Sequence, residues 1–154
     1  MNHESKNPYP KFLAMIATST VVMMILMYLN TYAIDHIFWS ETRAYMALLM
    51  GAAMAVVMLL FMLGMYPNRK ANFAIFGGSA VVFALCLWLI SSQSTVGEIS
   101  WMKAMIPHDS IAILTSERAT IKDPRVRELA DGIIEAQRKE IAEMKALIAD
   151  LESK

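Results

Sequence analysis

The sequence predicts an all-α membrane protein in which three transmembrane helices precede an external two-helix hairpin. Hydrophobic residues make up 56% of the 154 positions and include 14 methionines, whereas only 18% of the residues are charged. A soluble domain of this length is usually less apolar, so lipid is the expected solvent for much of the chain. Few charges interrupt the region from residue 12 to residue 97; they are Asp35, Glu41, Arg43, Arg69 and Lys70.

Three apolar stretches, 12–34, 44–66 and 73–92, are each longer than the roughly 18 residues that a bilayer-spanning helix requires. The hydrocarbon core holds no water to satisfy backbone N–H and C=O groups, so each stretch is expected to be helical throughout. The Pro67-Asn68 pair marks the break between the second and third stretches. Residues 12–92 are therefore expected to form a membrane domain with three spans.

Basic residues in the short connections predict the orientation of the chain. Two lysines precede the first span and Arg69-Lys70 lies between the second and third spans, whereas the loop 35–43 carries one arginine against two acidic residues. Because Lys and Arg favour the cytoplasmic side, residues 1–11 are expected to form a cytoplasmic tail. Three crossings then place residues 93–154 on the opposite side, which is the periplasm if the protein lies in a bacterial inner membrane.

The external segment is expected to contain two helices that begin at recognisable signals. Residues 95–98, Thr-Val-Gly-Glu, fit a capping box at the start of the first helix. Asp123-Pro124 is a second start signal, with an N-cap acceptor before a proline at the first helical position. The first helix is therefore expected to end near Lys122.

A heptad seam follows on the second external helix, where side chains repeat at alternating spacings of three and four. Its members are Ile134, Gln137, Ile141, Met144, Ile148 and Leu151. A hairpin of this size has little core of its own, so it is expected to dock on the spans or on another copy of the chain. The sequence thus favours a homo-oligomer formed through the external helices.

The first external helix carries a candidate metal site. Met102, Met105 and His108 recur every three residues and Asp109 is adjacent, so that these side chains would share one broad face. Thioether sulfur selects soft ions such as Cu(I), and methionine forms no disulfides in an oxidising compartment. The alternative is that both methionines only pack in the core and that His108 follows a kink at Pro107.

The second external helix offers further candidates on one face, at positions i, i+3 and i+7. They are Gln137, Glu140 and Met144. A polar Gln137 within the apolar seam either supports the metal cluster or fixes the register of the helices. His36, at the outer end of the first span, could also approach the hairpin, although a solvated polar residue is the commoner role.

Several functions lack the residues that they need. From Glu98 onward 9 basic and 11 acidic residues are interspersed, which is typical of a solvated surface and not of a nucleic-acid interface. No charge lies within a span core, so a charge-lined transport route is not indicated. The external segment contains no Glu-x-x-His motif and no nucleophile beside a plausible base, so we expect no enzymatic activity. Cys86 is the single cysteine and forms no disulfide within the chain.

Residues 101–112, WMKAMIPHDSIA, followed by residues 135–144, EAQRKEIAEM, resemble the bacterial domain-of-unknown-function 305 family. The resemblance implies ferritin-like helical units, of which this hairpin would be a half-bundle, and relatives that bind copper or silver through Met and His. Residues 30–36 and 45–51 also resemble a membrane-anchored subgroup with three spans, so that the resemblance extends over nearly everything after the first ten residues.

The family pattern Met-x-x-Met-x-Pro-His falls on Met102, Met105, Pro107 and His108, and Gln-x-x-Glu-x-x-x-Met falls on residues 137–144. Asp109 stands where the family commonly has a second histidine. A carboxylate is a harder ligand than imidazole, so this residue would weaken a Cu(I) site, shift it toward Cu(II) or Zn(II), or abolish it.

Two functional hypotheses follow. The first is an inner-membrane envelope protein that binds a soft metal, copper or silver, in metal homeostasis or tolerance, with Cu(I) as the expected ion. The second is a non-metal structural or interaction protein, a membrane-anchored oligomer that meets another envelope protein.

Overall fold

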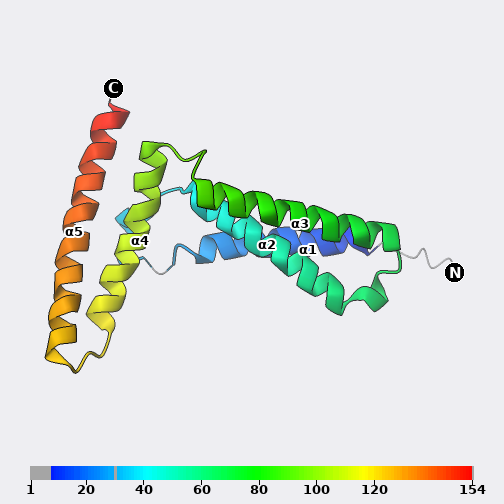
Figure 1. The fold of residues 1–154 in the computed structure, drawn as a ribbon, viewed down its shortest axis with the longest axis horizontal. Coiled ribbons are helices and arrows are strands. Elements are labelled where there is room, and N and C mark those ends of the chain that lie inside the picture. The colour runs from blue at the N-terminus through cyan, green and yellow to red at the C-terminus, as the bar shows by residue number, and fades with distance from the viewer. Residues whose placement is uncertain (1–7, 30, 154) are drawn as a thin grey trace. The chain divides into compact units, whose positions relative to one another are not determined.

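The computed structural model describes residues 8–29 and 31–153, and this part of the chain is all-helical with no strand, as the sequence predicts (Figure 1). Residues 1–7 of the expected cytoplasmic tail and Asn30 lie outside the described residues. The α-helices are α1 (Tyr9–Leu26), α2 (Glu41–Phe61), α3 (Arg69–Ser92), α4 (Glu98–Arg118) and α5 (Pro124–Glu152), with short 3-10 helices η1 (Ile34–His36) and η2 (Leu63–Met65).

The described chain divides into two compact units. The first contains residues 8–25 and 43–94, and therefore α3 and nearly all of α1 and α2. The second contains residues 26–42, apart from residue 30, together with 95–153, and therefore η1, α4 and α5.

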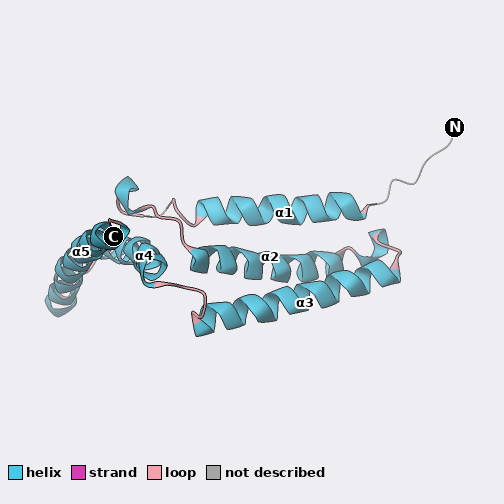
Figure 2. Ribbon diagram, turned by 90° about the horizontal axis from the view of Figure 1, so that it is seen from above, coloured by secondary structure: helices cyan, strands magenta, loops and turns pink. Residues whose placement is uncertain are grey.

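The first unit holds three helices that are long and apolar enough to cross a membrane, as the sequence predicts. They lie side by side in both ribbon views (Figures 1 and 2). Their shared core is small and centres on Phe12, Ala55, Leu59 and Tyr66, with the Phe12 ring edge-on to the Tyr66 ring at a centroid distance of 5.3 Å. Most other side chains are exposed and apolar, which suits a lipid environment.

The expected first span, helical from residue 12 to residue 34, is wrong at its C-terminal end. The helix α1 stops at Leu26, and Ile34 lies in η1. Beyond the helix the Thr31 hydroxyl donates to the Tyr28 carbonyl at 3.2 Å, and the Tyr32 N–H donates to the Ser110 side chain at 2.7 Å. These two side-chain hydrogen bonds satisfy the Tyr28 carbonyl and the Tyr32 N–H outside any helix.

The other two apolar stretches also shift at their ends. The helix α2 stops at Phe61, and η2 and a short connection follow, so the stretch is not helical throughout as far as Tyr66. The predicted break at Pro67-Asn68 is confirmed, because the Asn68 side chain caps α3 by accepting from the Ala71 N–H at 3.2 Å. The cap starts α3 at Arg69, four residues earlier than its apolar stretch.

The second unit is built on the packing of α4 against α5, which we call the α4–α5 pair. Seam residues of α5 lie buried against α4, so the seam is occupied within the chain. Its core consists of Met102, Ile106, Ile113, Ile141, Met144 and Ile148. Phe38 packs against this core from the segment between α1 and α2.

The predicted start signal of α5 is confirmed, whereas that of α4 is wrong. Asp123 caps α5 as predicted, accepting from the Arg125 N–H at 2.9 Å, and Pro124 occupies the first turn. The predicted capping box at residues 95–98 is wrong, because the N-cap of α4 is Gly97, which has no side chain. The end of α4 is Arg118, before the expected Lys122, since Ala119 is already extended.

Candidate functional site

Two methionines and a carboxyl group of α4 point toward α5. The helix is continuous through Pro107, and Met102, Met105 and Asp109 occupy positions i, i+3 and i+7, which share one helical face. Met102 and Asp109 are buried, and Met105 is partly buried. The sequence folds this way because the same face carries the core residues Ile106 and Ile113.

A pocket of about 190 Å³, which we call the methionine pocket, lies between α4 and α5 where these side chains meet Glu140 and Met144. It brings together the three thioethers of Met102, Met105 and Met144, each of which was a sequence-predicted ligand. Three carboxyl groups and the side chain of Trp101 also line it. The complete lining is Trp101, Met102, Met105, Asp109, Glu140, Glu143, Met144 and Leu147.

Gln137 does not line the pocket but supports one of its walls. With its amide assigned so that the nitrogen faces Asp109, Gln137 donates to both carboxylate oxygens, at 2.9 Å and 3.3 Å. The polar seam position that the sequence singled out therefore satisfies a buried carboxylate. Gln137 is a supporting residue, and Asp109 is the group that it holds in place.

Asp109 is only 4% exposed, and its pKa is raised to about 6. Burial is the largest cause and the charge of nearby Glu140 acts in the same direction, whereas His108 opposes them. Desolvation disfavours the ionised form, and a second carboxylate in the same pocket acts in the same direction. At neutral pH the pocket therefore contains a buried negative charge that would favour a bound cation.

His108 is the sequence-predicted residue that the structure leaves apart. It is exposed and does not line the pocket. Among the described residues, no three His, Cys, Asp or Glu side chains are grouped so that they could hold a metal ion. Any ion at this pocket would therefore depend on thioether donors. Sequence reasoning missed Trp101, Glu143 and Leu147, although Glu143 lies beside Met144 in the chain.

Comparisons with known proteins support the α4–α5 region as the part that defines the family. Residues 89–153 match the family described as "Domain of unknown function (DUF305)". The uncharacterized protein L153 of Acanthamoeba polyphaga mimivirus is 31% identical over 106 residues, which cover 68% of this chain and 68% of that protein. The chain belongs to the DUF305 family. No solved structure matches it significantly.

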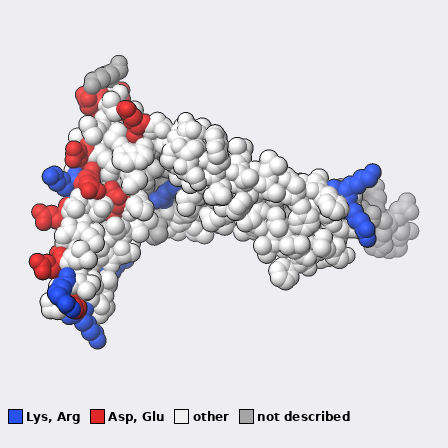
Figure 3. All heavy atoms as spheres, viewed as in Figure 1, with Lys and Arg blue, Asp and Glu red and all other residues white. Residues whose placement is uncertain are grey.

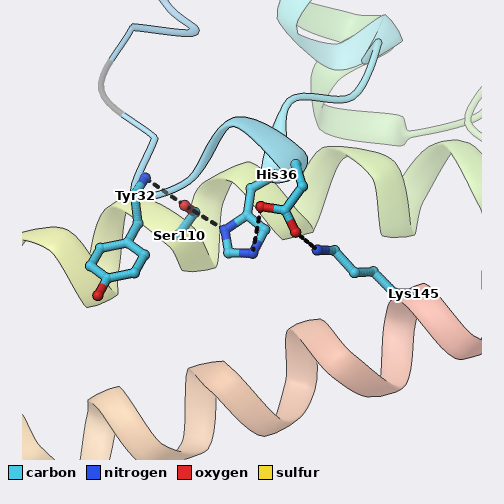
Figure 4. A network of polar contacts seen from close by, with 5 residues as sticks. Tyr32, His36, Ser110 and Lys145 are labelled. Carbon is cyan, nitrogen blue, oxygen red and sulfur yellow. Dashed lines mark hydrogen bonds and ion pairs between the residues drawn. The ribbon is translucent and has the colours of Figure 1, made fainter.

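The DUF305 match is narrower than the sequence resemblance suggested, because it covers α4 and α5 and only the end of α3. The loop that joins α1 to α2 lies outside it. In this DUF305 protein that loop nevertheless contacts the α4–α5 pair through Tyr32, Asp35 and His36 (Figure 4).

The contact centres on Ser110, which is fully buried. Its hydroxyl accepts from the Tyr32 N–H at 2.7 Å and lies 2.9 Å from His36 Nδ1. Because the hydroxyl oxygen already accepts a bond, its own proton is free to donate to Nδ1, which fits a neutral ring protonated at Nε2. Asp35 pairs with Lys145 of α5, so the loop bonds to both helices.

Tyr32 adds a second point of attachment. The guanidinium of Arg138 lies 6.0 Å from the centre of the Tyr32 ring, and the Tyr32 hydroxyl donates to Glu117 at 3.4 Å. Arg138 also pairs with Glu117. His36 therefore does approach the α4–α5 pair, as the sequence allowed, but its partner is Ser110 and not a residue of the methionine pocket.

The docked loop should be most stable above pH 6.5. Burial lowers the pKa of His36 below its ordinary value of 6.5, and Lys145 acts in the same direction, whereas Asp35 opposes them. The unfolded loop therefore binds more protons than the docked loop, so stability is lost as the pH falls below 6.5. We expect hydrogen exchange in residues 31–37, corrected for intrinsic rates, to become severalfold faster at pH 5.5 than at pH 7.5.

The His36→Gln variant is the control for that measurement. A neutral amide keeps a hydrogen-bonding group but does not titrate, so the pH dependence of loop protection should disappear. An unchanged pH dependence in this variant would assign the effect to another group.

Proposed function

We propose that this protein is a membrane-anchored, soft-metal-binding protein that holds Cu(I) or Ag(I) between α4 and α5. The observation that carries the proposal is the convergence of the Met102, Met105 and Met144 thioethers with the Asp109 carboxylate on one small pocket. Thioether donors favour soft monovalent ions over Zn²⁺ or Mg²⁺, and a carboxylate would neutralise the charge of the ion.

The residues of the pocket fit such an ion. Met102 and Met144 are held in place by the core of the α4–α5 pair, whereas the half-buried Met105 lies nearer to solvent and provides a route of entry. Gln137 orients Asp109, in the way that supporting residues orient ligands in metal sites. The ion supplies no reaction chemistry here, because binding and transfer are the roles that fit an envelope protein of metal homeostasis or tolerance.

The proposed setting is a bacterial inner membrane with the N-terminus in the cytoplasm and the α4–α5 pair in the periplasm, as a half-bundle of ferritin-like type. Support comes from the three apolar helices and from Lys11, Arg69 and Lys70, which would all lie on the cytoplasmic side. Methionine is a suitable soft donor in that oxidising compartment.

An anaerobic titration of Cu(I) against a competing chelator tests the proposal. The samples are full-length protein in detergent and a variant with Met102, Met105 and Met144 all changed to Leu, which keeps the apolar volume of the core. We expect sub-micromolar binding by the wild type. Loss of a supporting residue typically costs 10- to 100-fold in affinity, so loss of three donors should cost at least about 100-fold.

The matched control changes three methionines of α2, Met46, Met50 and Met54, to Leu. This variant removes the same number of thioethers from outside the pocket and should bind as the wild type does. His108→Ala should also bind normally, because His108 does not line the pocket. Equal, weak binding by every sample would favour the alternative function, a structural or interaction protein without metal.

A further inference from the structure

A second heptad stripe, which we call the outer stripe, runs along one flank of α5, roughly a quarter turn from the seam that packs on α4. Its members again alternate at spacings of three and four, and all of them are exposed. The loop that joins α1 to α2 contacts Lys145, Arg138 and Ser110, which do not belong to the stripe. The members of this outer stripe are Val126, Leu129, Ile133, Ala136, Glu140, Glu143, Leu147 and Asp150.

The outer stripe is symmetric about residue 138. Leu129 and Leu147 lie equally far from that position, and both are strongly exposed for leucine, at 65% and 47%. Two copies of α5 that cross antiparallel at residue 138 would therefore place each Leu147 opposite the partner copy's position 129. Such an arrangement is a two-fold symmetric contact, in which the same surface of each copy meets itself.

The shape of the surface fits this pairing. The N-terminal half of the outer stripe carries a shallow groove of about 490 Å³ that includes Leu129, Gly132 and Ile133. Gly132 has no side chain, and nothing lies within 4 Å of the position that a Cβ would take. In the antiparallel register, Leu147 of a second copy would fill this groove as a knob fills a hole.

The charges of the α4–α5 pair are complementary in the same orientation. Residues 118–127, around the start of α5, carry four basic side chains and one acidic one. Residues 139–152, toward its end, carry four acidic side chains and two lysines. Figure 3 shows basic atoms gathered at one end of the pair and acidic atoms toward the other. Antiparallel packing brings opposite ends together and also opposes the helix dipoles favourably.

We propose that a second copy of this chain docks on the outer stripe, with the two α5 helices antiparallel and crossing at residue 138. The dimer is formed by the outer stripe and not by the seam, which is occupied within each chain. Glu140, Glu143 and Leu147 belong both to the stripe and to the lining of the methionine pocket. The second copy therefore covers the mouth of that pocket, although the pairing itself needs no metal.

Disulfide cross-linking between two single-cysteine variants tests the pairing and its direction. Full-length protein carrying Cys86→Ser is prepared as Leu129→Cys and as Leu147→Cys, each with a different tag, and the variants are mixed in detergent and oxidised with diamide. The antiparallel register predicts that the mixture forms a cross-linked heterodimer, while either variant alone cross-links poorly. Efficient cross-linking of each variant with itself would show parallel packing and would overturn the proposal.

A size measurement keeps the proposal testable if cross-linking fails for geometric reasons. Native mass spectrometry of the metal-free protein should show a dimer. Leu147→Glu places a charge in the apolar groove of the partner copy. It should raise the dissociation constant of the dimer at least tenfold relative to the wild type. The control is Ala142→Glu, an exposed substitution on α5 outside the outer stripe. A monomeric wild type, or equal effects of both substitutions, would overturn the proposal.

Discussion

Replacing Ile106 with alanine should lower the free energy of unfolding of the α4–α5 pair by about 3 kcal/mol. Ile106 is 0% exposed and lies in the core with Met102, Ile113 and Met144. Removing its side chain loses buried apolar surface and leaves a cavity that neighbouring residues fill only in part. Alanine is also a good helix former, so the loss is one of packing and not of helix propensity.

Hydrogen–deuterium exchange of the full-length protein in detergent measures this loss, because it reports on α4 and α5 separately from the apolar helices. Peptides from both helices should exchange faster together, since they share one core. Ile34→Ala is the matched control, as Ile34 lies in the same unit but is 88% exposed. It should change local stability by less than about 0.5 kcal/mol. Equal effects of the two substitutions would contradict the packing.

The fold was largely predictable from the sequence because the strongest signals are long and local. Three apolar stretches indicate three long helices, and Asp123-Pro124 marks the start of α5 correctly. The end of α1 was not predictable from apolarity. The segment that follows α1 is held by Ser110, which is 78 residues away from Tyr32 in the chain and accepts its N–H. A contact between such distant residues leaves no periodic pattern in either segment.

In the candidate site, too, the sequence predicted some residues correctly and others wrongly. Met102 and Asp109 are seven positions apart, which is close to two full turns at 3.6 residues per turn, and both face the pocket. His108 is six positions from Met102, about 600° of rotation, and therefore points to a different side. Two residues three positions apart can still share a helical face, but a second step of three rotates the third residue away from that face. Asp109, and not the adjacent His108, is thus the residue that reaches the pocket.

Replacing Asp109 with asparagine should stabilise the metal-free α4–α5 pair at pH 7.5 by about 1 to 2 kcal/mol and have little effect near pH 4. Burial and the charge of Glu140 raise the pKa of Asp109 to about 6, above its ordinary value of 3.8. The folded state then binds more protons than the unfolded state between those values. Stability is therefore full below about pH 4 and is lost as the pH rises toward 6.

Asparagine has nearly the same shape as aspartate, accepts a bond from the Gln137 amide and never ionises, so it removes the cost without a cavity. Hydrogen exchange of α4 and α5 peptides at pH 4.5 and pH 7.5, in the presence of a chelator, measures the difference. Glu135→Gln removes an exposed charge from α5 and should have little effect at either pH. A gain of equal size at both pH values would show that ionisation of Asp109 costs nothing. A gain confined to pH 7.5 would show that the wild-type chain keeps a destabilising charge at the pocket, which a bound cation would neutralise.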